Sequence, residues 1–261
     1  MHIVLKIREL VLYREMIYSL VRRDLKGRYK GSVLGFLWTF LNPLFQLMVY
    51  TLVFSVIMKN NIEKYYLFLF VALVPWMFFS AALNTGSTCI LGQSDMINKI
   101  YFPREILPIA NVTSGFVNML LSFLVVLGIL IISGFGLNIQ ALLYLPMIMV
   151  IEFILTLGLV FLVSSITVYL RDLSYILTII TMAWQFLTPV MYSSEDVPRE
   201  LLPIFNLNPM TAITEAYRDI LYYKAIPEMG TLCQALVYGI VFLVLGFVIF
   251  DKLQRGFAEE L

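Results

Sequence analysis

Histidine, cysteine and charged residues are scarce in this chain. Of its 261 residues, one is histidine, two are cysteine and 13% are charged, whereas about a quarter of a typical soluble domain is charged. Because the only histidine is His2, the chain lacks the most common general base and any histidine-rich metal site. Cys89 and Cys233 both lie in apolar stretches, so neither a disulfide framework nor a thiolate metal cluster is expected.

Sequence motifs for nucleotide binding and hydrolysis are also absent. The chain has no GxxxxGK[ST], the loop whose backbone amides and lysine hold nucleotide phosphates. It has no HExxH, CxxC or GxSxG either. We therefore expect no catalytic residue, no metal and no cofactor bound by this chain, which does not hydrolyse ATP alone.

Apolar residues make up 61% of the sequence, and the mean hydropathy is +0.89. A water-soluble fold cannot bury so much apolar surface, and a membrane crossing needs about 20 apolar residues. The sequence predicts an all-α integral membrane protein with six transmembrane helices. The six apolar runs lie at about 33–58, 65–91, 106–133, 141–169, 174–192 and 232–250.

These runs divide the chain into three predicted parts. Residues 1–32 form an N-terminal segment, residues 33–251 form the six-helix transmembrane domain, and residues 252–261 form a short tail. Within the transmembrane domain, the stretch at about 193–231 is too polar to cross a membrane but has helical periodicity. Asn208 followed by Pro209 fits an N-cap and first-turn pair, and a shorter helical piece is predicted at Val197–Phe205.

The N-terminal segment predicts an amphipathic helix that lies in the membrane interface. One face is apolar: Ile3, Ile7, Leu10, Tyr13, Ile17, Val21 and Leu25. The opposite face is charged: Arg8, Glu15, Arg22, Arg23 and Lys26. Lys6 and Arg14 break the pattern. Two interpretations stay open, a simple membrane anchor and a helix at the mouth of a pathway that meets a cytoplasmic partner.

The distribution of basic residues predicts that both termini are cytoplasmic, since Lys and Arg are retained on that side. This topology places 13 of the 18 Lys and Arg residues inside. Outside it leaves Lys59, Lys64, Arg199, Arg218 and Lys224. Inside the spans, Glu152 is the one clear carboxylate, so a proton relay is not expected, and a structural hydrogen bond is the favoured role for its side chain.

Four stretches carry a resemblance that composition alone does not give. They are RDLKGRYKGSVLGFLWTFLNPL from Arg23, YFPREILPIA from Tyr101, VYLRDLSYILTIITMAWQFLTPVMY from Val168 and LNPMTAITEAYRDILY from Leu207. Together they resemble the permease subunit of polysaccharide-exporting ATP-binding-cassette transporters, over nearly the whole chain. Members of that family export O-antigen, teichoic acid or capsule chains.

The resemblance implies a homodimer of this chain, two separate ATPase subunits that bind ATP and Mg, and an undecaprenyl-linked glycan as substrate. It implies a multi-pass protein of the bacterial cytoplasmic (inner) membrane, in contact with lipids and with no nucleic-acid partner. It also implies that the polar connection at 93–105 docks on the ATPase. That assignment covers Asp95, Lys99, Arg104 and Glu105.

The basic residues before the first span suit an anionic headgroup. A lipid-linked phosphate or pyrophosphate arriving at the cytoplasmic surface would meet them there. The assigned gate residues are Arg22, Arg23, Lys26, Arg28 and Lys30. Positive-inside anchoring explains the same charges without a substrate.

Aromatic residues make up 15% of the chain, and sugars stack on aromatic faces through their C–H surfaces. Rings and amides can therefore line a channel along which a glycan slides. The candidates are Trp38, Asn42, Gln46, Tyr50, Trp76, Phe78, Phe79, Trp184, Phe186 and Tyr192. Interface anchoring and packing against lipid are the alternative roles for these rings.

By resemblance, the 193–231 segment forms paired re-entrant helices that close the outer exit. Glu215, Arg218 and Asp219 are assigned to the polar face of the second helix, as an outer gate. The predicted function is the transmembrane subunit of an ATP-driven polysaccharide exporter. The alternatives are an exporter of drugs or small lipids, and a membrane-embedded glycolipid enzyme, for which the sequence offers no acidic or histidine cluster.

Overall fold

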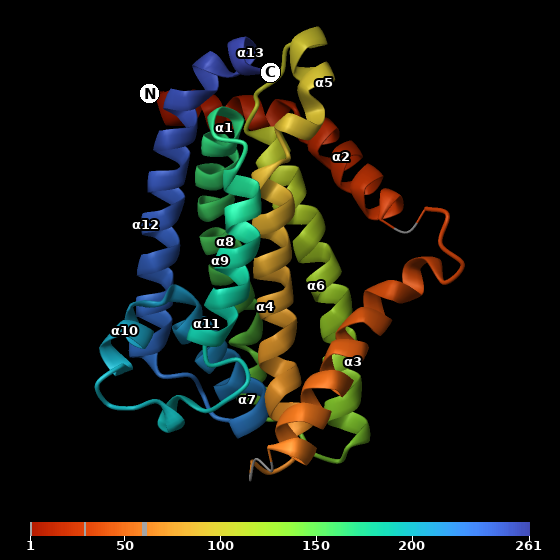
Figure 1. Ribbon diagram of the computed structural model, residues 1–261, viewed down its shortest axis with the longest axis vertical. Coiled ribbons are helices and arrows are strands. Elements are labelled where there is room, and N and C mark those ends of the chain that lie inside the picture. Colours follow the sequence, from red (N-terminus) through yellow and green to blue (C-terminus); the bar gives the residue numbers. More distant parts are fainter. Residues whose placement is uncertain (1, 29, 59–61) are drawn as a thin grey trace.

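The computed structural model describes residues 2–28, 30–58 and 62–261, and the side chains of residues 2–5 and 7 are outside this description. The predictions about His2, Ile3 and Ile7 side chains, and about Lys59, therefore fall outside the described residues. Within the described ranges the chain is entirely helical. Both termini lie at one end of an upright helical bundle, called the termini end here, and the opposite end is called the far end (Figure 1).

Five helical stretches of the described chain are long and apolar enough to cross a membrane: Gly35–Ile57, Tyr65–Ser87, Ile106–Ile132, Ile139–Tyr169 and Met229–Glu260. Their main helices are α3 (Trp38–Thr51), α4 (Tyr65–Ser87), α6 (Ile106–Ile132), α8 (Leu145–Tyr169) and α12 (Met229–Leu253). These five spans confirm five of the six predicted runs, because an unbroken apolar stretch is a local property of the sequence.

The sixth predicted run, 174–192, does not form a helix of membrane length. Helix α9 (Leu173–Leu187) has 15 residues, short of the roughly 20 that a full crossing needs. It ends because Thr188 precedes Pro189, and the proline ring disfavours the helical conformation of the residue before it. Thr188 is accordingly extended, with φ −108° and ψ 134°.

Shorter elements connect the spans. The α-helices among them are α1 (His2–Leu12), α2 (Arg14–Gly27), α5 (Ser94–Lys99), α7 (Ile139–Leu142), α10 (Leu202–Leu207), α11 (Pro209–Arg218) and α13 (Phe257–Glu260). The tight 3-10 turns are η1 (Gly35–Leu37), η3 (Leu91–Gln93), η4 (Ser194–Asp196) and η6 (Gln254–Gly256). The wider π turns are η2 (Leu52–Ile57) and η5 (Asp219–Tyr223).

The N-terminal segment is two helices, α1 and α2, that meet at Tyr13. Helix α1 lies across the termini end of the bundle, and α2 slopes away from it along α6 (Figure 1). After α2 the chain turns back toward α3 through Gly31 (φ +84°) and Gly35 (φ +47°), which lie in a left-handed region that glycine enters without steric cost.

The segment between α9 and α12 is helical, as predicted, although the first piece begins at Leu202 and not at Val197. Helix α11 has the predicted start, because the Asn208 side chain accepts a hydrogen bond from the Met210 N–H at 3.0 Å and Pro209 occupies the first turn. Nine of its ten residues are buried, so α11 belongs to the core of the bundle.

Helix α4 is the centre of the packed core, with 78% of its most apolar stretch buried, against 11% for the span that contains α3. Helices α8 and α12 approach each other closely at Gly158 and Gly246. A Cβ atom on Gly246 would lie 2.0 Å from the Gly158 carbonyl oxygen. Small residues permit such close contact between membrane helices.

Candidate functional site

A large groove opens beside α2 at the point where the chain turns into the first span. Its volume is about 1310 Å³, and it is bounded by α2, the Gly35–Phe36 turn and α6. Five cations line it, and no lining residue is a carboxylate: Arg14, Arg22, Arg23, Lys26 and Lys30. The rest of the lining is mostly apolar and includes Val21, Leu25, Phe36, Val117 and Leu121. We call this the basic groove.

Four of the five predicted gate residues thus share one groove, and Arg28 is the exception. Its guanidinium donates hydrogen bonds to Asp24 Oδ2 at 3.1 Å and to Ser114 Oγ at 3.2 Å. It lines a separate cavity of about 140 Å³ with Trp38 and Asn42. Arg14, one of the two residues that broke the amphipathic pattern, belongs to the basic groove instead.

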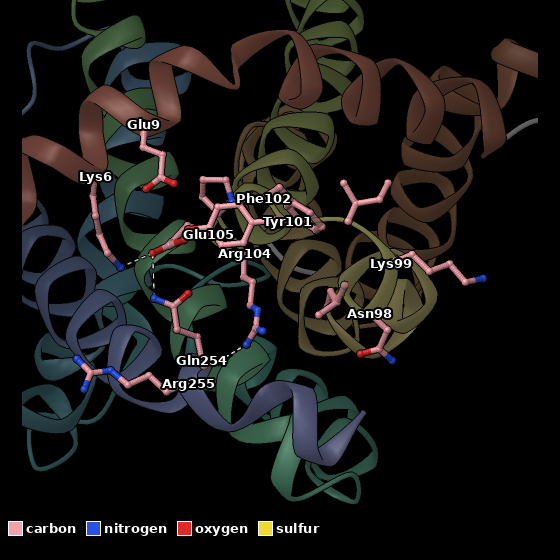
Figure 2. Close-up of a pocket in the computed structure, with 13 residues that line it drawn as sticks. Lys6, Glu9, Asn98, Lys99, Tyr101, Phe102, Arg104, Glu105, Gln254 and Arg255 are labelled. Carbon is pink, nitrogen blue, oxygen red and sulfur yellow. Dashed lines mark hydrogen bonds and ion pairs between the residues drawn. The ribbon is translucent and has the colours of Figure 1, made fainter.

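A second cavity, of about 520 Å³, lies at the termini end under the connection between α5 and α6 (Figure 2). It is lined by Lys99, Arg104 and Glu105 of that connection together with Lys6 and Gln254 from the two ends of the chain. We call it the loop cavity. Three of the four predicted coupling residues line it, and Asp95 lies outside it.

The four coupling residues divide into an exposed pair and a buried pair. The side chains of Asp95 and Lys99, both on α5, are 96% and 74% exposed, and Lys99 Nζ lies 3.7 Å from Asp95 Oδ1. Glu105 is 3% exposed, so its side chain is buried in this chain, and its contact with a partner stays a prediction. Its carboxylate is held inside the chain by Lys6 and by Gln254 Nε2 at 3.1 Å.

Arg104 also points into the chain. It donates to the Gln254 carbonyl oxygen, and its guanidinium carbon lies 5.7 Å from the centre of the Phe257 ring (Figure 2). Arg104 and Glu105 therefore fix the loop to the C-terminal residues, and the surface left for a partner is formed by α5 and the exposed residues Ile100 and Tyr101.

The sequence analysis missed Lys6, Asp251 and Gln254 as members of this site. Lys6 forms ion pairs with both Glu105 and Asp251. Burial is the largest single influence on the pKa of Lys6 and lowers it, but the hydrogen bonds to Asp251 and Glu105 and the charges of these carboxylates together raise it by more, so the net pKa lies above its usual value. The signal was present, because Lys6 is a cation on the otherwise apolar face of the N-terminal helix.

A third groove, of about 590 Å³, follows the middle of the bundle between α3, α4 and α9. Four predicted channel residues line it: Asn42, Gln46, Tyr50 and Trp76. Two further amides, Asn84 and Gln185, complete the lining, and Gln185 Nε2 donates to the Tyr50 hydroxyl at 3.4 Å. We call this the amide groove.

The other predicted channel aromatics lie elsewhere. Phe79 is fully buried and packs edge-on against Trp184, at 5.1 Å between ring centres. Trp184 in turn donates from Nε1 to Asn208 Oδ1 at 2.8 Å, which joins α9 to the start of α11. Phe78 is 4% exposed and packs against Phe116. These three rings stabilise the fold of one chain.

Phe186 and Tyr192 lie near the end of α9. Phe186 is 59% exposed on the outer surface of the bundle. The Tyr192 hydroxyl donates to the Phe186 carbonyl oxygen at 2.6 Å, which holds the chain after Pro189 against the helix. The structure does not place either residue in the amide groove.

The three predicted outer-gate residues do not share an exposed face. Arg218 is 2% exposed; it donates to the Val190 and Tyr192 carbonyl oxygens at 2.7 and 3.0 Å and lies over the Phe68 ring. The prediction that Arg218 lies on the polar face of its helix is wrong. The extended backbone after α9 covers this side chain and supplies the carbonyl groups that accept its hydrogen bonds. Burial lowers the Arg218 pKa to about 10, so the side chain remains charged at neutral pH.

Glu215 and Asp219 are partly exposed near this buried arginine. Glu215 accepts a hydrogen bond from Ser194 Oγ. Burial, with the nearby carboxylates Glu215 and Glu228, raises the pKa of Asp219 to about 6. Among the described residues, no group of three or more His, Cys, Asp or Glu side chains could hold a metal ion.

The fold and these sites define a multi-pass helical membrane protein that has a basic groove at one end, an amide groove along its spans and an exposed polar helix at the termini end. A model of the ABC-2 type transporter family matches residues 15–222. The chain belongs to that family.

Individual relatives cover almost the full length of the chain. It is 35% identical over 257 residues to the O-antigen export system permease protein RfbA of Myxococcus xanthus, covering 98% of each chain. It is 29% identical over 247 residues to an RfbA of Klebsiella pneumoniae, covering 95% of each. The polysialic acid transport protein KpsM of Escherichia coli is 22% identical over 248 residues, with 92% of this chain and 94% of KpsM covered.

Proposed function

We propose that this chain is the transmembrane subunit of an ATP-driven exporter that moves a lipid-linked polysaccharide across the bacterial cytoplasmic membrane. The observation that carries the proposal is the basic groove, in which five cations surround an apolar lining with no carboxylate among the lining residues. A diphosphate headgroup is bound by such cations, and a polyprenyl chain suits the apolar lining. The relatives named for O-antigen export and polysialic acid transport support the same substrate class.

The termini end is the cytoplasmic end in this proposal, since 13 of the 18 Lys and Arg residues then lie inside. The exposed surface of α5, with Asp95 and Lys99, is the contact for the ATPase subunit, which binds ATP and Mg. Helix α9 and the extended residues after it serve as the sixth crossing, and α10 and α11 form the re-entrant outer segment.

Two copies of the chain enclose the pathway. Helices α3 and α9 leave apolar side chains exposed on either side of the amide groove, among them Phe45, Met48, Val49, Ile179 and Met182. Large apolar exposure beside a polar groove is expected where a second copy or lipid covers it. The glycan then passes along the amide groove, where amides and the ring of Tyr50 face it, whereas Trp76 is 2% exposed and packs against Phe79.

The test is export in a host that synthesises the lipid-linked glycan but lacks its own exporter. The chain and its cognate ATPase are expressed together, and glycan at the cell surface is measured. Wild-type chain restores surface glycan, and replacement of Arg22, Arg23, Lys26 and Lys30 by Gln lowers it at least tenfold. Arg199→Gln, which removes a cation outside all of these cavities, is the matched control.

Two results contradict the proposal in different ways. Full export by the quadruple variant rules out headgroup binding in the basic groove. Absence of surface glycan with the wild-type chain, when small amphipathic lipids or drugs stimulate its ATPase and leave the cell, establishes the alternative exporter class.

A further inference from the structure

The N-terminal helices are held on α6 by two separate polar contacts. At the beginning of α6, Glu105 pairs with Lys6 of α1. Nine positions further along, Ser114 Oγ donates to Asp24 Oδ2 of α2 and accepts from Arg28 at 3.2 Å. One long helix therefore carries both partners, and the first lies at the end of the loop that follows α5.

The first contact is shielded from water, whereas in the second the Asp24 and Arg28 side chains are 45% and 28% exposed around a buried serine. The side chains of Lys6 and Glu105 are 14% and 5% exposed, and Ser114 is fully buried. A buried charge that loses its partner is strongly destabilising, because it is left without solvent or a counter-charge. Separation of α1 from Glu105 is therefore disfavoured over movement of the two together.

Apolar contacts join the same elements between the two polar contacts. Leu20 and Val21 of α2 pack in one buried cluster with Phe102 and with the first turns of α6, including Ile106 and Leu107. The N-terminal helices thus contact α6 continuously from its first residue to Ser114. The basic groove lies between α2, α6 and the Gly35–Phe36 turn, so two of its three walls are parts of this one unit.

Lys6 has a second partner on a different helix, Asp251 at the end of α12. If α6 shifts relative to α12, Lys6 cannot keep both carboxylates. The contacts of α2 with α6 at Asp24, Leu20 and Val21 retain the N-terminal helices on α6. Such a shift breaks the contact of Lys6 with Asp251, together with the hydrogen bonds that Glu105 and Arg104 make with Gln254.

We propose that Lys6 and Asp24 are positioning residues that make α1, α2 and α6 one rigid unit, so that displacement of the α5–α6 loop carries the basic groove with it. This inference rests on the proposed function, in which a partner ATPase moves that loop. In this proposal the N-terminal segment connects the α5–α6 loop to the basic groove, whereas a simple membrane anchor would not.

The first experiment measures glycan exported per ATP hydrolysed by the complex of this chain with its ATPase. Lys6→Gln and Glu105→Gln each lower this ratio at least fivefold while ATP hydrolysis continues. The charge swap Lys6→Glu with Glu105→Lys, which keeps one lysine beside two carboxylates, restores the ratio to within twofold of wild type. Arg8→Gln, an exposed cation on the same helix, is the matched control.

The Asp251→Asn variant distinguishes a unit that moves relative to α12 from one that is fixed to α12. It removes the other carboxylate beside Lys6, and the export ratio stays within twofold of wild type if the contact with Asp251 opens during transport. An equal loss in the Asp251→Asn and Glu105→Gln variants overturns the proposal, because Lys6 then acts by fixing α1 to α12.

A second experiment does not depend on export. Spin labels are placed at Arg8→Cys and Leu124→Cys (α6), or at Arg8→Cys and Val248→Cys (α12), in a chain with Cys89→Ala and Cys233→Ala, diluted with unlabelled chain. On binding of a non-hydrolysable ATP analogue, the α1–α6 distance is unchanged and the α1–α12 distance changes. The reverse pattern contradicts the rigid unit, whereas loss of glycan export with the expected distances contradicts only the proposed function.

Discussion

The Tyr217 hydroxyl donates a hydrogen bond to Glu152 Oε2 across 2.6 Å, and both side chains are fully buried. This contact joins α11 to the middle of α8. Ionisable groups inside a membrane protein are costly unless they face the bundle interior and are paired. The placement agrees with the structural role predicted for Glu152, and it fixes the segment proposed as re-entrant to a spanning helix.

Tyr217→Phe is expected to destabilise the protein. It removes the donor to Glu152 Oε2, while Glu152 Oε1 already lacks a hydrogen-bond partner among the described residues. Loss of a partner for a buried polar group costs about 1–3 kcal/mol. The unfolding temperature in detergent should therefore fall for Tyr217→Phe. The unfolding temperature should fall less for Glu152→Gln, because its amide oxygen still accepts the hydrogen bond. An equal fall in both variants would show that packing, and not this hydrogen bond, is responsible.

Gly246→Ala is expected to separate α8 from α12. The added Cβ would meet the Gly158 carbonyl oxygen at 2.0 Å, and backbone cannot move aside as a side chain can. Overpacking of this kind costs about 1–3 kcal/mol. Gly128→Ala is the control, since a Cβ at Gly128 meets nothing within 4 Å. Thermal unfolding in detergent measures both variants, and an unchanged midpoint for Gly246→Ala contradicts the close approach.

Asp219→Asn is expected to stabilise the far end at neutral pH and to have no effect in acid. The folded pKa of Asp219 is raised from 3.8 to about 6, so the fold favours the protonated form. Its contribution to stability is complete below pH 4 and is lost as the pH rises through 6. The gain at pH 7.5 is about 1 kcal/mol or less, since solvent screens this half-exposed group. Unfolding midpoints at pH 4 and 7.5 measure it.

The matched control for Asp219 is Glu200→Gln, an exposed carboxylate in the same segment. Its midpoint should follow that of the wild type at both pH values. A stabilisation by Asp219→Asn that is equal at pH 4 and pH 7.5 would show that the cause is not ionisation.

A photo-crosslinking residue at Lys99 is expected to label the ATPase subunit in the assembled complex. Lys99 and Asp95 are the coupling residues that remain exposed, so a partner can reach them. The same probe at Glu105, which is 3% exposed, should label only this chain. Gel analysis after irradiation distinguishes the two, and labelling of the ATPase from Glu105 alone would reverse the assignment of the contact surface.

The sequence predicts the local features of this fold well. Five membrane spans follow from apolar runs, and the start of α11 follows from Asn208 and Pro209, because capping depends only on neighbouring residues. The shared lining of the basic groove by Arg22, Arg23 and Lys26 follows in part from their spacing on α2, whereas Lys30 lies in the turn after that helix.

The features that the sequence did not predict depend on contacts between distant segments. Arg218 lies on a helix that looks amphipathic, but the carbonyl groups that bury it come from residues 190 and 192. Glu105 was assigned to a partner contact by family resemblance, but it is buried in this chain, and its ion-pair partner Lys6 is 99 residues away. The periodicity of apolar residues indicates which residues share a face of one helix, but it does not indicate which other segments of the chain pack against that face.

The 15 residues of α9 span about 22 Å at 1.5 Å per residue, which is less than the ~30 Å hydrocarbon layer. In the proposed arrangement the extended residues after α9 add to the length of this crossing, and local thinning of the bilayer matches the remainder. Acyl-chain length should therefore influence this protein, with reconstituted complexes more active in bilayers of shorter lipids than in thick, long-chain membranes.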